Sequence, residues 1–344
     1  LYGLDDFDDS LVADYQYDLW RMAVSIVLDA RANETFNAKE QKKAVKKFAK
    51  AYLKEIRNYS KDDNEKEVIL TKKTAPSLIA DYLEKVEEKN DRSKMLKKWT
   101  IEEGDTRVFN FDKSKLEKIS EEKYKKMCEA IDQYKSTLSD DFTEWDDKHF
   151  KIKDIAKRVK AGTGSIGSDR YYVLLEGGEE HEEDDRILDV KFQDKPPLYY
   201  HMNSEEQKEY EQAFLHEGER HALAFKALAE HPDKYLGWLT LDDQIFSVRE
   251  LSPFKDDYPT HKLKDKSDFY DISEIWGQLL ATRHERASYQ VGEETFNMPK
   301  TLAELTEDKE KDFVKLVQSI SLQYADCVQN DFSLFVELNQ KEII

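Results

Sequence analysis

Hydrophobic residues recur at spacings of three and four along the first part of the chain. The positions that follow this spacing are Leu19, Met22, Ala23, Ile26 and Val27 in one segment and Ala44, Phe48, Tyr52 and Ile56 in the next. Segments 77–86 and 124–136 repeat the pattern, with a less regular stretch at 100–112 between them. Side chains at this spacing share one face of an α-helix. The sequence therefore predicts amphipathic helices over most of residues 11–138.

The hydrophobic period changes to two between about residues 150 and 253, which predicts β-strands. The expected strands are 171–176, 187–192, 236–241 and 245–251. Gly177-Gly178 and Asp242-Asp243 supply the residue types that tight turns between such strands require. The strands therefore predict a small antiparallel sheet.

Helical periodicity interrupts this sheet and then returns. One helix is expected at 204–231, and further helices at 272–286 and 309–338. We therefore expect an α+β protein of two lobes. Residues 150–255 would form the sheet lobe, and residues 1–149 and 256–344 would together form a helical lobe.

Acidic residues outnumber basic ones, with 73 Asp and Glu against 54 Lys and Arg and a formal net charge of −19. This charge argues against nucleic acid or an anionic membrane as a partner. No apolar run in the sequence approaches the roughly 20 residues that span a bilayer. Cys128 and Cys327 lie far apart in helix-like patterns, so we expect buried free thiols in a reducing compartment and a cytoplasmic protein.

A glycine-rich segment, Gly162-Thr163-Gly164-Ser165-Ile166-Gly167, leads into the strand that begins at Tyr171. Such a pattern alone marks a tight turn about as often as a binding loop. A dinucleotide-binding fold would open a helix at the third glycine, and a Walker loop would end in Gly-Lys-Ser or Gly-Lys-Thr, so the sequence excludes both. The remaining functional interpretation is a strand–turn–strand flap whose backbone N–H groups approach phosphate oxygens.

Lys191 follows the apolar run Ile187-Leu188-Asp189-Val190 and shares a strand face with Asp189. A lysine in this position is commonly a solvated strand residue. In a kinase-like site it would instead bind the nucleotide's phosphates and be held by a glutamate on a helix. Glu217 is the candidate glutamate on the helix that follows, with Glu219 as the runner-up and a solvated acidic residue as the alternative.

The same helix carries two histidines in the run His216-Glu217-Gly218-Glu219-Arg220-His221. A zinc-protease helix needs its histidines four residues apart so that both face one metal. These two are five apart, about 140° around a helix. We therefore expect polar surface or packing histidines rather than metal ligands.

Aspartates cluster at the start of the sequence, in Leu4-Asp5-Asp6-Phe7-Asp8-Asp9. Mg²⁺ prefers carboxylate oxygens and keeps several waters, so one or two aspartates facing a nucleotide's phosphates suffice to hold it. The alternative is an acidic turn that caps the helix that follows it.

These segments together resemble known families. Asp6-Phe7-Asp8-Asp9 followed by Tyr17-Asp18-Leu19 is similar to the metal-binding segment of aminoglycoside-phosphotransferase-type kinases. The whole chain resembles the bacterial domain-of-unknown-function family 2252. The further segments that carry this resemblance are Gly162 to Gly167, Val190-Lys191, Glu217-Gly218-Glu219-Arg220, Leu236-Gly237-Trp238, Val248-Arg249-Glu250-Leu251 and Leu280 to Arg286.

The resemblance implies a circularly permuted kinase-like fold, because the metal aspartates precede the glycine-rich loop. Asp6 would bind Mg²⁺ with help from Asp8 or Asp9, Lys191 would bind the phosphates of ATP, and Glu217 would orient Lys191. The residues that would surround the nucleotide further are Gly162, Thr163, Gly164, Ser165 and Gly167 at the phosphates and Arg249, Glu250 and Leu251 at the adenine.

The implied activity is phosphoryl transfer from ATP to a hydroxyl of an unknown small-molecule or protein acceptor. The alternatives are nucleotidyl transfer on the same fold and a nucleotide-binding pseudokinase or interaction scaffold. The family also carries a Gly-Asp-x-His-x-x-Asn segment before its aspartates, whereas this sequence starts at Leu1. We therefore expect a longer natural chain that holds the catalytic base there, or else a member that lacks the base and only binds nucleotide.

Overall fold

The computed structural model of the chain describes residues 1–33, 36–61, 67–104, 106–112, 115–138, 150–160, 167–177, 184–263, 265–291 and 297–340. The structure is α+β, as predicted. None of its helices, within these residues, is long and apolar enough to cross a membrane. The chain divides into two compact units. We call them the helical unit, Leu1–Leu4, Val12–Tyr82 and Asp257–Ile344, and the sheet unit, Asp5–Leu11 and Leu83–Asp256.

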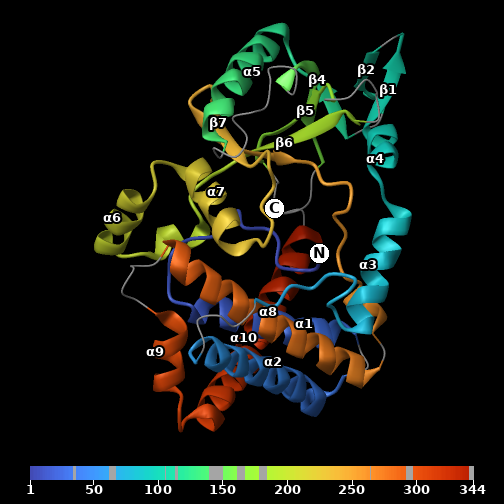
Figure 1. Cartoon of the computed structure of the whole chain (residues 1–344). Helices are drawn as coiled ribbons and strands as arrows, with labels where there is room; N and C mark the ends of the chain where they lie inside the picture. Colours follow the sequence, from blue (N-terminus) through green and yellow to red (C-terminus); the bar gives the residue numbers. More distant parts are fainter. Residues whose placement is uncertain are drawn as a thin grey trace. The chain divides into compact units, whose positions relative to one another are not determined.

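The helical unit is built around two packed helices, α2 (Ala38–Tyr59) and α8 (Lys266–Val291) (Figure 1). α2 begins at a capping box, in which the side chains of Asn37 and Glu40 each accept the other residue's backbone N–H. The predicted apolar face of α2 is confirmed, because its members Ala44, Phe48, Tyr52 and Ile56 are buried. A Cβ on Gly277 of α8 would lie 2.4 Å from the Phe48 carbonyl oxygen, so glycine permits the close approach of the two helices.

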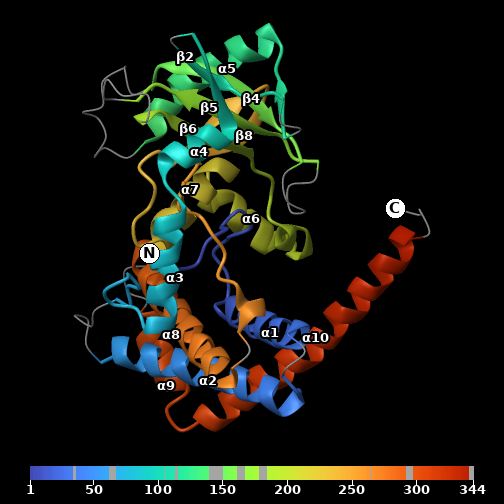
Figure 2. The same ribbon diagram turned by 90° about the vertical axis from the view of Figure 1, so that its right-hand side faces the viewer.

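The remaining helices of the helical unit are α1 (Gln16–Ala32), α9 (Met298–Leu305) and α10 (Glu310–Gln340). α10 packs on α1 and α2, and its second half continues beyond them, where Phe332 and Phe335 are exposed (Figure 2). Cys327 of α10 is also exposed, whereas Cys128 in the sheet unit is half-buried. Both are free thiols, so the expected burial is wrong for Cys327.

A six-stranded antiparallel sheet with the strand order β3-β4-β5-β6-β8-β7 forms the centre of the sheet unit. Its strands are β3 (Leu116–Lys118), β4 (Ile152–Arg158), β5 (Arg170–Leu175), β6 (Arg186–Phe192), β7 (Gly237–Leu241) and β8 (Gln244–Glu250). β5 to β8 confirm the four predicted strands. The predicted turn between β7 and β8 is also confirmed, since Asp242 and Asp243 both have positive φ, 50° and 62°.

The expected irregular stretch at 100–112 contains a two-stranded hairpin, β1 (Thr100–Glu103) and β2 (Thr106–Phe109). Each strand has only four residues, which is too short to display a hydrophobic period in the sequence. α3 (Ser77–Lys89) and α4 (Arg92–Trp99) precede the hairpin, and α5 (Glu121–Tyr134) follows β3.

Alternation along the strands gives the sheet two covered faces. Val173 and Val190 point to α5, whereas Tyr172 and Ile187 pack with Trp99 and its neighbours on α4. Because α4 and α5 pack on the sheet, the sheet unit starts at Leu83, well before the division near residue 150 that their helical pattern suggested.

The predicted helix at 204–231 is wrong as a single element, because two helices occupy it, α6 (Ser204–Ala213) and α7 (Glu217–Leu228). The break arises at His216, which has an extended backbone and accepts the Glu219 N–H on its Nδ1 atom. α7 packs on β7 and β8, and a Cβ on Gly218 would lie 2.6 Å from the Trp238 Cβ. Glycine at 218 therefore brings α7 against the sheet.

Candidate functional site

Two segments that are far apart in the sequence meet in the sheet unit, where Asp8 forms an ion pair with Lys191, 183 residues away. Lys191 lies on β6 and is opposite Ser247 of β8 in the strand register. The Asp8 and Lys191 side chains are only 23% and 20% exposed. The structure thus brings together the lysine and one of the aspartates that the sequence singles out.

Two further side chains hold the Asp8 carboxylate. Gln193 Nε2 donates to Asp8 Oδ1 at 2.9 Å and to Ser247 Oγ at 3.0 Å, and His221 Nε2 lies 3.3 Å from the same Oδ1. Sequence reasoning missed Gln193 and Ser247. Gln193 is two residues after Lys191, and side chains two residues apart on a strand point to the same face. The period of a strand could therefore have predicted Gln193 beside Lys191. Ser247 depends on the pairing of β6 with β8, which the sequence does not specify.

His221 is buried, with 2% of its surface exposed. Of the two predicted roles, polar surface residue and packing residue, the surface role is therefore wrong for His221. Burial lowers the pKa of His221 despite the nearby Asp8 carboxylate, which favours the neutral ring. The Nε2 atom then carries the proton that Asp8 accepts. The Nδ1 atom is buried and has no partner within the described residues. His216 packs on Trp238 with ring centroids 5.5 Å apart, as a packing histidine would.

The two carboxyl groups of Asp6 and Asp8 interact with each other. Burial alone would raise the pKa of Asp8, but hydrogen bonds from His221, Asp6 and Lys191 hold it well below its usual range. The bond to Asp8 raises the pKa of Asp6, and partial burial adds to this effect. Asp6 also has a positive φ of 70°, which is uncommon for a residue other than glycine. The pKa values of the two carboxyl groups are therefore shifted in opposite directions, with that of Asp8 lowered and that of Asp6 raised.

Arg220 of α7 holds the backbone around Asp8. Its guanidinium donates to the carbonyl oxygens of Asp8 at 2.7 Å, Ser10 at 2.5 Å and Asp194 at 3.3 Å. Its Nε atom donates to Glu217 Oε2 at 2.6 Å. Arg220 is 1% exposed, and it is among the largest fully buried side chains of the described residues. Arg220 belongs to the segment Glu217-Gly218-Glu219-Arg220 that carries the family resemblance, but the sequence analysis assigned no role to it.

Glu217 does not contact Lys191 in the described part of the chain. Its carboxylate accepts hydrogen bonds from Arg220 and from the Tyr210 hydroxyl, the latter at 2.6 Å. Glu219, the runner-up, accepts the Leu215 N–H at 2.7 Å. Lys191 instead has Asp8 as its acidic partner.

The segment expected at the adenine has other backbone partners in this structure. The N–H of Glu250 donates to the Asp233 carboxylate, and the N–H of Leu251 donates to the Ile187 carbonyl at 2.8 Å. Arg249 Nη1 lies 3.4 Å from Asp5 Oδ1, and Lys255 Nζ lies 2.5 Å from Asp5 Oδ2. An adenine at Glu250 and Leu251 would therefore use their carbonyl oxygens unless these N–H groups change partners.

The glycine-rich loop lies mostly outside the described residues, which exclude Gly162, Thr163, Gly164 and Ser165. Gly167 is described and has a positive φ of 79°, the conformation that favours glycine. In the sequence, the segment lies between β4 and β5.

Asp6 and Asp8 are the candidate metal-binding side chains of this site. No group of three or more His, Cys, Asp or Glu side chains in the described residues could hold one. Mg²⁺ needs only one or two carboxylates when substrate phosphates and waters complete its shell. Asp6 and Asp8 supply two neighbouring carboxyl groups, which is the number that this smaller requirement asks for. Asp9 is exposed on the same turn.

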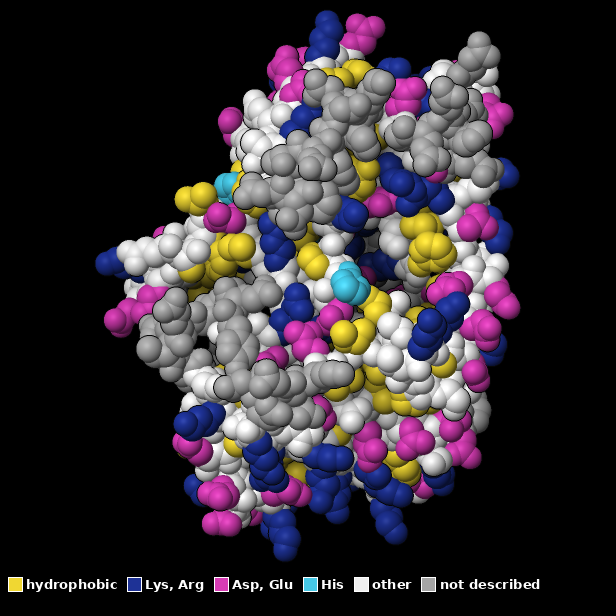
Figure 3. Space-filling model, in the orientation of Figure 1, with side chains coloured by type: hydrophobic (Ala, Val, Ile, Leu, Met, Phe, Trp, Pro, Cys, Tyr) yellow, Lys and Arg dark blue, Asp and Glu magenta, His cyan; other side chains and the backbone are white. Residues whose placement is uncertain are grey.

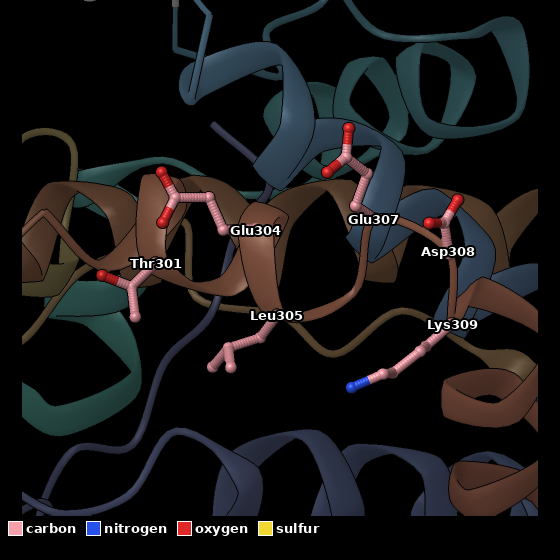
Figure 4. Close-up of a pocket in the computed structure, with 6 residues that line it drawn as sticks. All are labelled: Thr301, Glu304, Leu305, Glu307, Asp308 and Lys309. Atoms are coloured by element: carbon pink, nitrogen blue, oxygen red, sulfur yellow. The ribbon is translucent and has the colours of Figure 1, made fainter.

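Two places in the helical unit have weaker claims to be a site. The hollow at the turn between α9 and α10 is lined by six residues whose side chains do not converge, since Leu305 and Lys309 point to one side and Glu304 and Glu307 to the other (Figure 4). His284 of α8 has both ring nitrogens engaged, with Tyr52 at 2.8 Å and Asp18 at 3.3 Å.

Acidic and basic side chains are interspersed over the face shown in Figure 3, so the net charge of −19 does not gather there into a single acidic area. The site and the fold define an α+β protein whose sheet unit carries a partly buried acid–base cluster. The chain belongs to the family of uncharacterised proteins conserved in bacteria (DUF2252), which it matches over residues 1–338. Searches among curated proteins and among solved structures gave no match.

Proposed function

We propose that this protein binds ATP with Mg²⁺ on a circularly permuted kinase-like fold and transfers a phosphoryl group to a hydroxyl acceptor. The observation that carries the proposal is the contact between Asp8 and Lys191 in the sheet unit. Kinase sites combine a glycine-rich turn between two strands, a lysine on the following strand and a metal-binding aspartate. Here β4 and β5 flank the glycine-rich segment, β6 carries Lys191, and Asp8 meets that lysine.

Each residue has a specific task in this proposal. Lys191 binds phosphate oxygens, and the glycine-rich loop covers them with its backbone N–H groups. Asp6 and Asp8 hold Mg²⁺, which supplies neutralisation of the charge on the transferred group. The acceleration would come from positioning and charge stabilisation rather than from a covalent intermediate. The free thiols of Cys128 and Cys327 favour the reducing environment of the cytoplasm.

One observation favours a second candidate, a nucleotide-binding pseudokinase without transfer activity. Active kinases hold the strand lysine with a helix glutamate. Glu217 is engaged with Arg220 and Tyr210 instead, and Lys191 with Asp8. Both candidates use the same nucleotide site. In the kinase, Glu217 would move to Lys191 when nucleotide binds, whereas in the pseudokinase Glu217 would stay with Arg220 and Tyr210.

Nucleotide binding is tested by thermal unfolding with Mg²⁺ and ATP. A ligand at 100 times its Kd stabilises the folded protein by about 2.7 kcal/mol. Lys191→Met and Asp6→Asn should each lose this stabilisation. Lys126→Met should keep it, because Lys126 lies on α5, on the sheet face opposite Lys191, and pairs with Asp242 at 2.9 Å. Absence of any shift in the wild type at millimolar nucleotide would overturn the proposal.

Product analysis separates the remaining activities. Release of ADP with a phosphorylated acceptor supports phosphoryl transfer, and release of pyrophosphate with a nucleotidylated acceptor supports nucleotidyl transfer instead. Nucleotide binding with neither product, over a broad panel of hydroxyl acceptors, supports the pseudokinase.

A further inference from the structure

Arg220 hydrogen-bonds to the aspartate-bearing segment in addition to its ion pair with Glu217. One carboxylate, that of Glu217, already balances the guanidinium. The remaining donors go to backbone carbonyls of Asp8, Ser10 and Asp194. Two of these carbonyls flank Asp9, so the planar fork of the arginine spans the turn that carries Asp8.

A second contact from α7 holds the same turn. The Phe7 ring packs edge-on against Phe225 of α7 with centroids 4.7 Å apart, and Phe7 is 7% exposed. Within the turn, the Ser10 hydroxyl donates to the Phe7 carbonyl at 2.6 Å. α7 therefore fixes residues 7–10 at both ends, by an apolar contact and by the Arg220 fork.

We propose that Arg220 is the positioning residue that keeps Asp8 beside Lys191, and that Glu217 acts on the site through Arg220. Residues 5–11 belong to the sheet unit, whereas residues 1–4 and 12–82 on either side of them belong to the helical unit. This short segment therefore needs contacts of its own to lie against the sheet. Arg220 supplies such a contact, because its donors reach backbone atoms and so fix the turn itself.

The contacts of Glu217 define its part in this arrangement. Its carboxylate accepts from Arg220 Nε and from the Tyr210 hydroxyl, so it holds the guanidinium plane in the orientation that reaches the carbonyls. Lysine at position 220 would keep the charge but lose the fork. One ammonium group cannot span the Asp8 and Ser10 carbonyls and Glu217 in the same geometry.

The metal-binding test rests on the proposed function. Mn²⁺ binding in the presence of a non-hydrolysable ATP analogue is measured by electron paramagnetic resonance for the wild type, Arg220→Lys and Arg107→Lys. Arg107 is a matched control, because it lies on β2 in the same unit, is buried and pairs with Asp185 at 3.2 Å. We expect Arg220→Lys to weaken Mn²⁺ binding by about 10- to 100-fold, as loss of a group that orients a metal ligand does.

The control should change Mn²⁺ affinity by less than about 3-fold while losing comparable thermal stability, since each change replaces a buried guanidinium. Glu217→Gln should weaken Mn²⁺ binding in the same direction as Arg220→Lys, because Glu217 orients the Arg220 guanidinium. Equal Mn²⁺ affinities for Arg220→Lys and Arg107→Lys, or an unchanged Mn²⁺ affinity of Glu217→Gln, would overturn the inference.

Hydrogen exchange of the peptide covering residues 5–11 gives a readout that needs no ligand. We expect this peptide to exchange at least about 10-fold faster in Arg220→Lys than in Arg107→Lys, because an amide that loses its ordered turn opens more often. If the wild type binds neither Mn²⁺ nor nucleotide but the exchange difference appears, the proposed function fails and the positioning role of Arg220 stands. If the exchange rates match, the positioning role fails whatever the ligand result.

Discussion

The ion pair between Asp8 and Lys191 should contribute measurably to the stability of the sheet unit. Asp8 also accepts from Gln193 and His221, so Asp8→Asn would place an amide with two donors among three other donors. Lys191→Met leaves the carboxylate with its other two partners. We therefore expect Asp8→Asn to cost about 3 kcal/mol and Lys191→Met about 1–3 kcal/mol, the range for breaking charged hydrogen bonds with partial burial.

A double-mutant cycle isolates the pair itself. In the Asp8→Asn background, Lys191→Met should cost little or even stabilise, because the ammonium has already lost its counter-ion. We expect a coupling free energy of about 1.5–3 kcal/mol. The matched control is Lys157 with Asp169 on the same sheet, whose side chains are 39% and 35% exposed. Its coupling should be below about 1 kcal/mol because solvent screens it.

The assay is urea unfolding read by hydrogen exchange of peptides from β6 and β8. These peptides report the sheet unit alone, whereas a single optical probe would mix two units that need not unfold together. A coupling below about 0.5 kcal/mol, or one equal to the control, would refute the reasoning. Such a result would mean that the Asp8 carboxylate is held mainly by its uncharged neighbours.

The pH dependence of the coupling has a definite sign. The folded pKa of Asp8 lies well below its usual range, so the unfolded chain takes up the proton first as pH falls. The stabilisation should be fully present above about pH 5 and should decline as pH falls through about 4, near the unfolded pKa. A coupling that grows between pH 5 and pH 3 would contradict this assignment.

Three further predictions concern the packing and titration of the two units. Gly218→Ala should destabilise the sheet unit by about 1–3 kcal/mol, seen as faster exchange in β7 and β8, because the added Cβ would meet Trp238 at 2.6 Å. Gly277→Ala should destabilise the helical unit by a similar amount against the Phe48 carbonyl, seen in α2 and α8 peptides with β6 unchanged. Burial raises the pKa of Glu250 to about 7. Because a raised acid pKa favours folding at low pH, the free energy of unfolding of the wild type, measured in urea, should fall relative to Glu250→Gln as pH rises from about 4.5 to 7.5, by up to about 3 kcal/mol.

Much of the fold could be predicted from local pattern. β5 and β6 are short apolar runs, β7 alternates between buried and more exposed residues, and the buried face of α2 follows helical spacing. These patterns can be read from the sequence because each is a property of a single element. The break between α6 and α7 escaped this reasoning. His216 interrupts the helix by capping the next one, and its apolar neighbours continue the helical spacing across the break.

The candidate site shows the same limit. Lys191 and Asp8 could be selected from their segments, and alternation places Gln193 on the face of Lys191. The basic partner of Glu217 could not be chosen from the sequence. Arg220 lies one helical turn from Glu217 and is a possible partner by spacing, whereas a contact with Lys191 would depend on how α7 packs on the sheet. The free energy that decides between these partners comes from burial, which depends on the whole unit.

The sequence by itself determined the class of structure, the strands β5 to β8 and most helices, and the residue types suited to phosphate and metal. The tertiary structure decided which of those residues meet. It joined residues 5–11 to a sheet whose strand β6 lies 183 positions later, and it gave Asp8 its lysine, its histidine and its arginine. The physical reason is that hydrophobic periodicity is a local property, whereas the pairing of buried charges is fixed by three-dimensional packing and the desolvation that accompanies it.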